Sequence, residues 1–193
     1  MSRPTRRLVL AQLGLLPMVL SAAPQSVVAQ EARARDLLQR GEAVVYFRHG
    51  ATTHSGVDRI EWPRSRQRLL SDLGIAQSRL IGAAFRDQDL PVGDVLASPF
   101  ARCRDMAEIA FGRVEERMEL LGLLSDAEGR AERVAFLRGQ LSARPENGNR
   151  IVVSHRSNIA EVAGVMLGEG DGVIVEPNGA GFDVLATLAP DDW

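Results

Sequence analysis

Two of the three histidines in this chain each lie two residues after the end of a short apolar run. His49 lies near the end of Ala-Val-Val-Tyr-Phe-Arg-His-Gly (residues 43–50), and His155 closes Ile-Val-Val-Ser-His (residues 151–155). Short runs of β-branched and aromatic residues predict buried strands rather than helices. Because ligands of α/β proteins bind at the carboxyl ends of parallel strands, we expect both imidazoles at one edge of a sheet.

Two arginines accompany these histidines. Arg48 precedes His49, and Arg102 falls in the first turn of the helix that we expect after Ser98-Pro99. The N-terminus of a helix favours anions through its free N–H groups and its dipole, and a guanidinium matches phosphate oxygens in a fork. The four side chains therefore indicate a pocket that suits a phosphoryl group, stabilised by preorganised charge.

The elements that must position these residues alternate between strand and helix, which is typical of a single α/β domain. Ser71 is a favourable N-cap for a helix to about Phe85. Further strands are predicted at 94–97, 172–176 and 181–187, and helices at 31–40, 127–141 and 158–167. The connection 51–70 is long and arginine-rich, as loops that carry function often are. Residues 114–124 predict a brief strand followed by a loop.

Residues 1–29 have the pattern of a secretory signal peptide. A basic start precedes an apolar stretch from Leu8 to Leu20, and Ala29 ends a tail of small residues. The stretch is too short to span a membrane comfortably, so we expect no stable anchor after cleavage. Thr5-Arg6-Arg7 also resembles a twin-arginine signal, which leaves Sec and twin-arginine export open. We therefore expect residues 30–193 to form one exported domain, periplasmic or secreted.

The amino-acid composition excludes several kinds of site and ligand. All 23 basic residues are arginines, so no lysine is available for a Schiff base or a P-loop. After cleavage 20 arginines remain (23 minus three) against 25 acids, formally −5, which offers no general footprint for nucleic acid. The single cysteine, Cys103, excludes an intramolecular disulfide and is most simply a small core residue. We expect no metal and no cofactor; the sequence gives no indication of an oligomeric state.

Four motifs carry a resemblance to a known family. They are Arg48-His49-Gly50, Leu70-Ser71-Asp72-Leu73-Gly74 with Gln77, Ser98-Pro99-Phe100-Ala101-Arg102, and Val153-Ser154-His155. In this order they resemble the histidine phosphatase superfamily over nearly all of the expected mature chain. The resemblance implies a three-layer α/β sandwich, phosphoglycerate-mutase-like, with a mostly parallel central sheet flanked by helices.

The same resemblance implies the roles of the site residues. His49 would be the nucleophile that forms a phosphohistidine, which splits one difficult displacement into two easier ones. Arg48, Arg102 and His155 would hold the phosphoryl oxygens, with His155 charged while it does so. The family needs no metal and acts on small phosphorylated substrates.

The expected proton donor departs from the family pattern. Relatives carry a Leu-x-Glu motif between the second strand and the last histidine, whereas this chain has Met118-Glu119-Leu120-Leu121. We take Glu119 as the first candidate, with Asp126 and Glu128 as alternatives. Without a well-placed acid, activity on poor leaving groups would fall about 10²–10⁴-fold.

Other residues are expected to border the substrate. Gly50 would leave room for a ligand beside the backbone, and Arg68 would touch the phosphate or point to solvent. Asn158 would cap the helix after His155 or orient its ring. His54, in the long connection, is expected to be a bystander.

The function that we expect is that of a metal-independent phosphomonoesterase. A non-catalytic periplasmic protein that binds a phosphorylated ligand in the arginine-rich pocket is the alternative from another class. Phosphoglycerate mutase and phosphohistidine-protein phosphatase activities fit the expected export less well.

Overall fold

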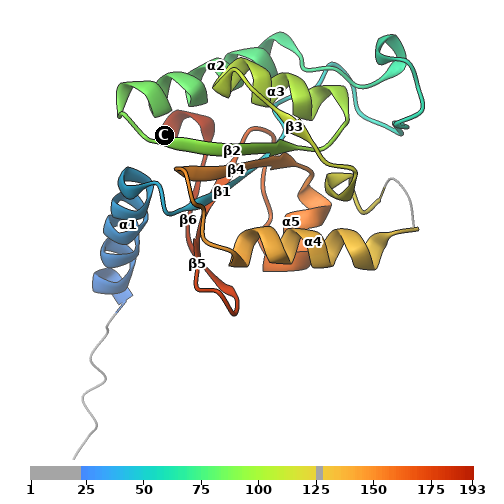
Figure 1. Cartoon of the computed structure of the whole chain (residues 1–193). Coiled ribbons are helices and arrows are strands. Elements are labelled where there is room, and N and C mark those ends of the chain that lie inside the picture. Colours follow the sequence, from blue (N-terminus) through green and yellow to red (C-terminus); the bar gives the residue numbers. More distant parts are fainter. Residues whose placement is uncertain (1–22, 125–127) are drawn as a thin grey trace, which may run out of the picture.

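The computed structural model describes residues 23–124 and 128–193. It consists of one six-stranded sheet with helices on both faces, as Figure 1 shows. The strands are β1 (Val44–Arg48), β2 (Val92–Ala97), β3 (Glu115–Glu116), β4 (Asn149–Ser154), β5 (Gly172–Pro177) and β6 (Phe182–Leu188). The expected α/β sandwich is therefore confirmed.

The sheet order is β3-β2-β4-β1-β5-β6. Neighbours from β3 to β1 pair in parallel, and β5 and β6 add antiparallel strands at one side. β1 and β4 lie side by side with Arg48 opposite Ser154. The register thus puts His49 and His155, one step past each strand, next to one another at the same edge.

The helices are α1 (Ala23–Arg40), α2 (Asp72–Asp87), α3 (Ala101–Phe111), α4 (Arg130–Ser142) and α5 (Arg156–Ala163). In Figure 1, α2 and α3 cover one face of the sheet, and α4 and α5 cover the other. α1 packs against β5 and β6. Three short 3-10 turns complete the chain at Arg64–Arg66, Met118–Leu120 and Pro190–Asp192.

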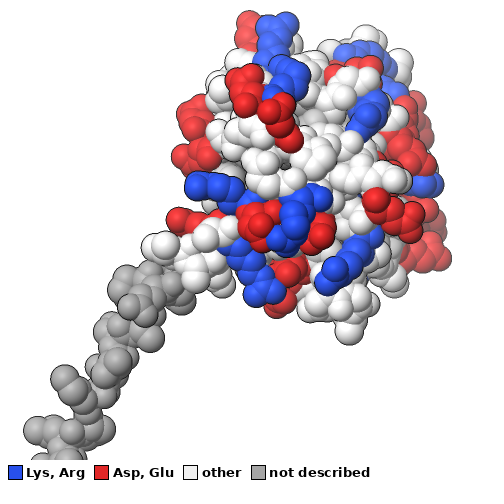
Figure 2. All heavy atoms as spheres, turned by 60° about the vertical axis from the view of Figure 1, so that its left-hand side comes forward, with Lys and Arg blue, Asp and Glu red and all other residues white. Residues whose placement is uncertain are grey.

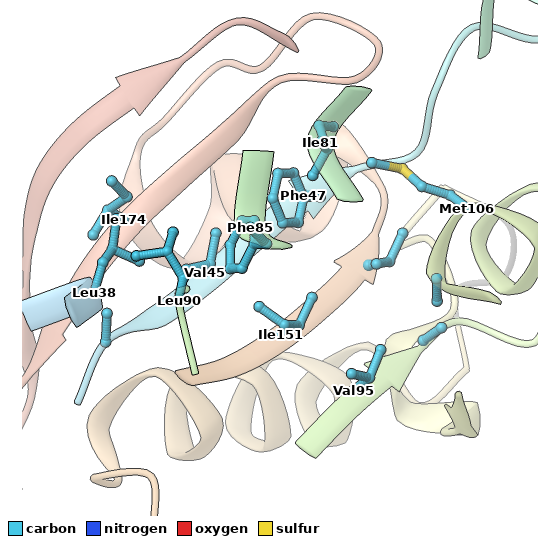
Figure 3. Packing of buried hydrophobic residues seen from close by; sticks show 14 of the residues in the cluster. Leu38, Val45, Phe47, Ile81, Phe85, Leu90, Val95, Met106, Ile151 and Ile174 are labelled. Carbon is cyan, nitrogen blue, oxygen red and sulfur yellow. The ribbon is translucent and has the colours of Figure 1, made fainter. Parts of the chain in front are cut away.

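Alternate residues of the strands divide the core into two clusters. Val45 and Phe47 of β1 point to the side of α2 and α3, whereas Val44 and Tyr46 point to the side of α4 and α5. Figure 3 shows the first cluster, in which Phe47 packs against Phe85 of α2. Strands buried on both faces have no polar side, which explains the continuous apolar runs in the sequence.

Helix boundaries follow the local signals with two differences. Ser71 caps α2 as expected, because its side chain accepts the N–H of Gly74. The helix expected at 158–167 instead spans Arg156–Ala163, since Gly164 adopts a left-handed conformation (φ 69°) that ends it. α1 begins at Ala23 and so includes the expected helix at 31–40.

The expected signal peptide comprises residues 1–29. Its residues 1–22 lie outside the described part of the chain. α1 continues across the cleavage position that we expect after Ala29. None of the helices among the described residues is long and apolar enough to cross a membrane. On the face drawn in Figure 2, arginines and acidic residues are interspersed, and that face carries no extended basic patch.

Candidate active site

His49 is buried at the end of β1, and its ring nitrogens have different environments. Nδ1 lies 2.9 Å from the carbonyl oxygen of Gly50. A carbonyl oxygen only accepts, so Nδ1 carries the proton and the lone pair of the neutral ring is on Nε2. Nε2 makes no hydrogen bond with another described residue, and His49 lines a cavity of about 840 Å³. The lone pair of Nε2 is thus available to a ligand in this cavity.

His155 lies beside His49, with 5.5 Å between the ring centroids and an angle of 67° between the rings. Its Nε2 is 2.8 Å from Ser98 Oγ, and its Nδ1 is 3.4 Å from Arg102 Nη2. A guanidinium only donates, so Nδ1 accepts and the proton of the neutral ring is on Nε2. Both predicted histidines and the predicted Arg102 therefore meet at one site.

Burial keeps both imidazoles neutral in the unliganded protein. Loss of solvent and, second to it, the nearby charge of Arg102 lower the pKa of His49 to about 3. The pKa of His155 is well below its ordinary value for the same two reasons, in that order. The charged His155 that the resemblance implies is therefore not the state of the unliganded site.

Arg102 is buried and has a buried partner that the sequence did not point to. Its Nη1 donates to Asp58 Oδ2 at 2.5 Å, and the two side chains are only 5% and 4% exposed. Asp58 also accepts the backbone N–H groups of Arg59 and Arg68 at 3.0 Å. One carboxylate therefore compensates the charge of Arg102 and fixes the path of the 51–70 connection. Arg102 Nε is buried and has no partner among the described residues, so a donor remains for an anion.

Arg48 and Arg68 share another acidic partner, Glu169. Its Oε1 lies 3.3 Å from Arg48 Nη2 and 3.5 Å from Arg68 Nη2. Arg48 also donates to the carbonyl of Leu167, and Arg68 donates to Thr52 Oγ1 at 2.6 Å. Both guanidiniums line the cavity with His49. Arg68 is thus placed with the predicted site residues, and Glu169 holds two cations whose segments are far apart in the sequence.

The N-terminus of α3 differs from the expectation of free N–H groups. The N–H of Ala101 donates to Gln67 Oε1 at 3.0 Å, and those of Cys103 and Arg104 donate to the carbonyl of Phe100. Gln67 in turn donates to the carbonyl of Trp62 at 2.9 Å. An anion at this site would therefore meet the side chain of Arg102 instead of these three N–H groups.

Three predicted site residues have other surroundings. Glu119 is half-buried on the turn Met118–Leu120 and does not line the cavity. Gly50 packs against α2: a Cβ there would lie 3.0 Å from the carbonyl oxygen of Gly74, so the missing side chain makes room for a helix. Asn158 uses its amide to accept from Leu123 N and donate to Leu121 O, so it positions that loop and contacts neither the ring of His155 nor the cavity.

The alternatives to Glu119 are not placed at the site either. Asp126 lies outside the described residues, and Glu128 is exposed and is not among the residues that line the cavity. His54 is exposed and does not line the cavity, and Cys103 is buried in the core. Asp58 and Glu61 are the acidic residues on the described cavity wall. No group of three His, Cys, Asp or Glu side chains in the described part of the chain is arranged to hold a metal ion.

The neutral histidines predict a pH dependence of stability. The folded-state pKa of His49, about 3, is below the ordinary value of about 6.5 that the unfolded chain should have. Between these values the unfolded chain binds more protons, so the free energy of unfolding falls as the pH is lowered from 6.5 towards 3. Each such histidine contributes up to about 1.4 kcal/mol per pH unit. Urea unfolding at several pH values should show a shallower slope for His49→Gln than for the native chain; equal slopes would contradict the assignment.

Comparisons with known proteins agree with this geometry. The family model of the histidine phosphatase superfamily (branch 1) matches residues 44–128, which include Arg48, His49, Arg68 and Arg102. No curated protein matches the chain. Many solved structures do.

The protein histidine phosphatase SixA, complexed with tungstate, is 18% identical with a TM-score of 0.60, covering 77% of this chain and 97% of its own. The protein TTHB049 from Thermus thermophilus is 21% identical with a TM-score of 0.54, covering 76% and 99%. A mutant phosphoserine phosphatase from Entamoeba histolytica, in complex with phosphoserine, is 12% identical with a TM-score of 0.54, covering 78% and 98%. At these identities the likeness establishes the fold. The chain is therefore similar to the histidine phosphatase superfamily in the sequence of residues 44–128, in its fold and in the meeting of His49, His155 and Arg102 at one site.

Proposed function

We propose that this chain is a metal-independent phosphatase that hydrolyses a phosphomonoester through a phosphohistidine on His49. The observation that best supports the proposal is the orientation of His49. Its Nδ1–H bonds to Gly50, which leaves Nε2 with a lone pair in a cavity whose lining includes the guanidiniums of Arg48, Arg68 and Arg102. Neutral imidazole next to preorganised positive charge suits attack on an anionic phosphoryl group.

The reaction would proceed in two displacements. His49 Nε2 forms a bond to phosphorus while the bond to the alcohol oxygen breaks, and the alcohol leaves with a proton from an acid. Water then attacks phosphorus and gives a proton back to the deprotonated acid, the P–N bond breaks, and inorganic phosphate leaves with His49 neutral again. Arg48, Arg68 and Arg102 would stabilise the phosphoryl oxygens in both steps, and His155 would join them by taking up a proton once the anion raises its pKa.

The proton donor that we propose is Glu61. Asp58 is held by Arg102, whereas Glu61 is exposed on the cavity wall and makes no ion pair with another described residue. It lies on the 51–70 connection instead of the segment after β3 from which the sequence led us to expect the donor.

Replacement of Glu61 by glutamine is expected to lower kcat about 10²–10⁴-fold for alkyl phosphates, whose alkoxides leave poorly without a proton. Nitrophenyl phosphate, which has a good leaving group, should lose much less. Steady-state kinetics on both esters provide the measurement. Glu119→Gln is the matched control and should leave both rates near those of the native chain; the reverse pattern would favour Glu119 as the donor.

The test of the proposed function is turnover of an aryl phosphate by the purified mature chain, with inorganic phosphate binding measured by calorimetry in parallel. Release of phosphate, with an acid-labile phosphoryl group on the quenched protein, supports the enzyme. Binding of phosphate without hydrolysis of any ester would instead favour the non-catalytic ligand-binding protein.

We also propose that the chain is exported to the periplasm or secreted, by a Sec or twin-arginine signal over residues 1–29. The basic start and the apolar stretch that follows it support this proposal. Mass spectrometry of the protein recovered from the periplasm or medium should give an N-terminus at Gln30. A full-length chain that stays in the cytoplasm would contradict it.

A further inference from the structure

The cavity that contains His49 is much larger than a phosphoryl group requires. Its volume is about 840 Å³, in the range of about 300–1,000 Å³ that holds drug-sized ligands. The buried residues His49, Arg102 and His155 form part of its wall. The remaining space is available to the part of a substrate that carries the phosphate.

Exposed apolar side chains are concentrated around this space. Val57, Leu124 and Met166 line the cavity and are 76%, 87% and 67% exposed. They belong to three separate segments: the 51–70 connection, the loop after Met118–Leu120, and the segment after α5. Single exposed apolar residues are common on protein surfaces, but three of the seven large ones in the described part of the chain border this one cavity.

Other residues of the cavity wall are also suited to contact an apolar group of a ligand. Further apolar residues also line it, namely Ile60, Phe100, Leu121 and Ala160. Arg59 and Arg156 are exposed on the same wall, and neither side chain makes an ion pair with another described residue. Guanidinium groups stack on aromatic faces, so these two arginines favour a ring over an aliphatic chain.

We propose that the outer part of this cavity is a subsite for a bulky apolar alcohol, preferentially aromatic, of the phosphomonoester substrate. The inference rests on the proposed phosphatase function, because the subsite adjoins the phosphoryl-binding arginines. Burial of an additional apolar ring against Val57, Leu124 and Met166 should raise kcat/KM about tenfold.

The experiment compares phenyl phosphate with 2-naphthyl phosphate, whose phenols have nearly the same acidity. Similar acidity keeps the chemical step similar, so a preference reports contact with the larger ring. We expect kcat/KM to be about tenfold higher for the naphthyl ester, mainly through a lower KM. Met166→Gln should reduce this ratio several-fold. Met118→Gln is the matched control, because Met118 is equally an exposed methionine but does not line the cavity.

The outcomes separate the subsite from the phosphatase function. Equal kcat/KM for the two aryl esters, or equal effects of the two methionine substitutions, would overturn the subsite while the phosphatase function stands. A preference for glycerol phosphate over phenyl phosphate would overturn it too. Failure to hydrolyse any of the three esters, with phosphate bound by calorimetry, would instead overturn the phosphatase function on which the subsite rests.

Discussion

Replacement of His49 by alanine is expected to lower kcat/KM for an aryl phosphate by at least about 10⁴-fold, because no other described group is oriented to replace Nε2 as a nucleophile. The native chain, quenched during turnover, should carry acid-labile phosphate. The alanine variant should carry none. Rapid-quench labelling with a ³²P aryl ester, followed by acid and base treatment, measures both quantities.

His54→Ala is the matched control for this experiment. His54 is exposed on the 51–70 connection and does not line the cavity, so its loss should leave turnover and labelling near the native values. Turnover that persists in the His49 variant, or a phosphoryl group that is stable to acid, would remove His49 from the role of nucleophile.

Replacement of Asp58 by alanine is expected to destabilise the fold by about 3–5 kcal/mol, because it leaves the buried guanidinium of Arg102 without a partner. It also removes the acceptor for two backbone N–H groups of the 51–70 connection. Urea unfolding gives the free energy of unfolding. Asp58→Asn keeps only one of the two oxygen acceptors and loses the charge, and should fall between the alanine variant and the native chain.

The matched control is Asp105→Ala, which breaks the exposed ion pair of Asp105 with Arg64 and should cost about 0.2–1 kcal/mol. Inorganic phosphate should stabilise the Asp58 variants more than the native chain, since the anion would replace the missing carboxylate beside Arg102. Equal stabilisation of all chains by phosphate would show that the anion does not approach Arg102.

The strands that hold the two histidines could be predicted from the sequence because their signals are local. Val44–Phe47 and Ile151–Val153 are buried on both faces, and such burial requires continuous β-branched and aromatic residues. The cap at Ser71 is equally local, because its side chain reaches only three residues ahead to Gly74. Arg48 and Arg102 were expected at the same edge because Arg48 precedes His49 and Arg102 falls in the first turn after the next strand, which are also local signals.

The residues that the sequence did not identify are those whose partners are distant along the chain. Asp58 is one of 25 acidic residues, and only folding brings it to Arg102, 44 positions away. Glu169 is 121 positions from Arg48 (169 minus 48) and looks like an ordinary acid of a Gly-rich turn. Gln67 has no local signature either, because its amide oxygen accepts a backbone N–H of another segment.

The proposed proton donor was also placed by contacts between distant segments and not by a local signal. Glu119 lies in the segment where relatives carry an acid, but a side chain becomes a donor only where the folded loop directs it to the substrate. The 3-10 turn at Met118–Leu120 keeps Glu119 away from the cavity wall, and the 51–70 connection brings Glu61 to it.

By itself, the sequence determined the order of strands and helices and the pair of histidines that follow buried strands, because burial and periodicity are local properties of the chain. Only the tertiary structure decided which charges compensate Arg102 and Arg48, which tautomers the imidazoles adopt, and which apolar side chains border the cavity. These properties depend on distances between segments far apart in the sequence, and those distances are set by the packing of the whole domain.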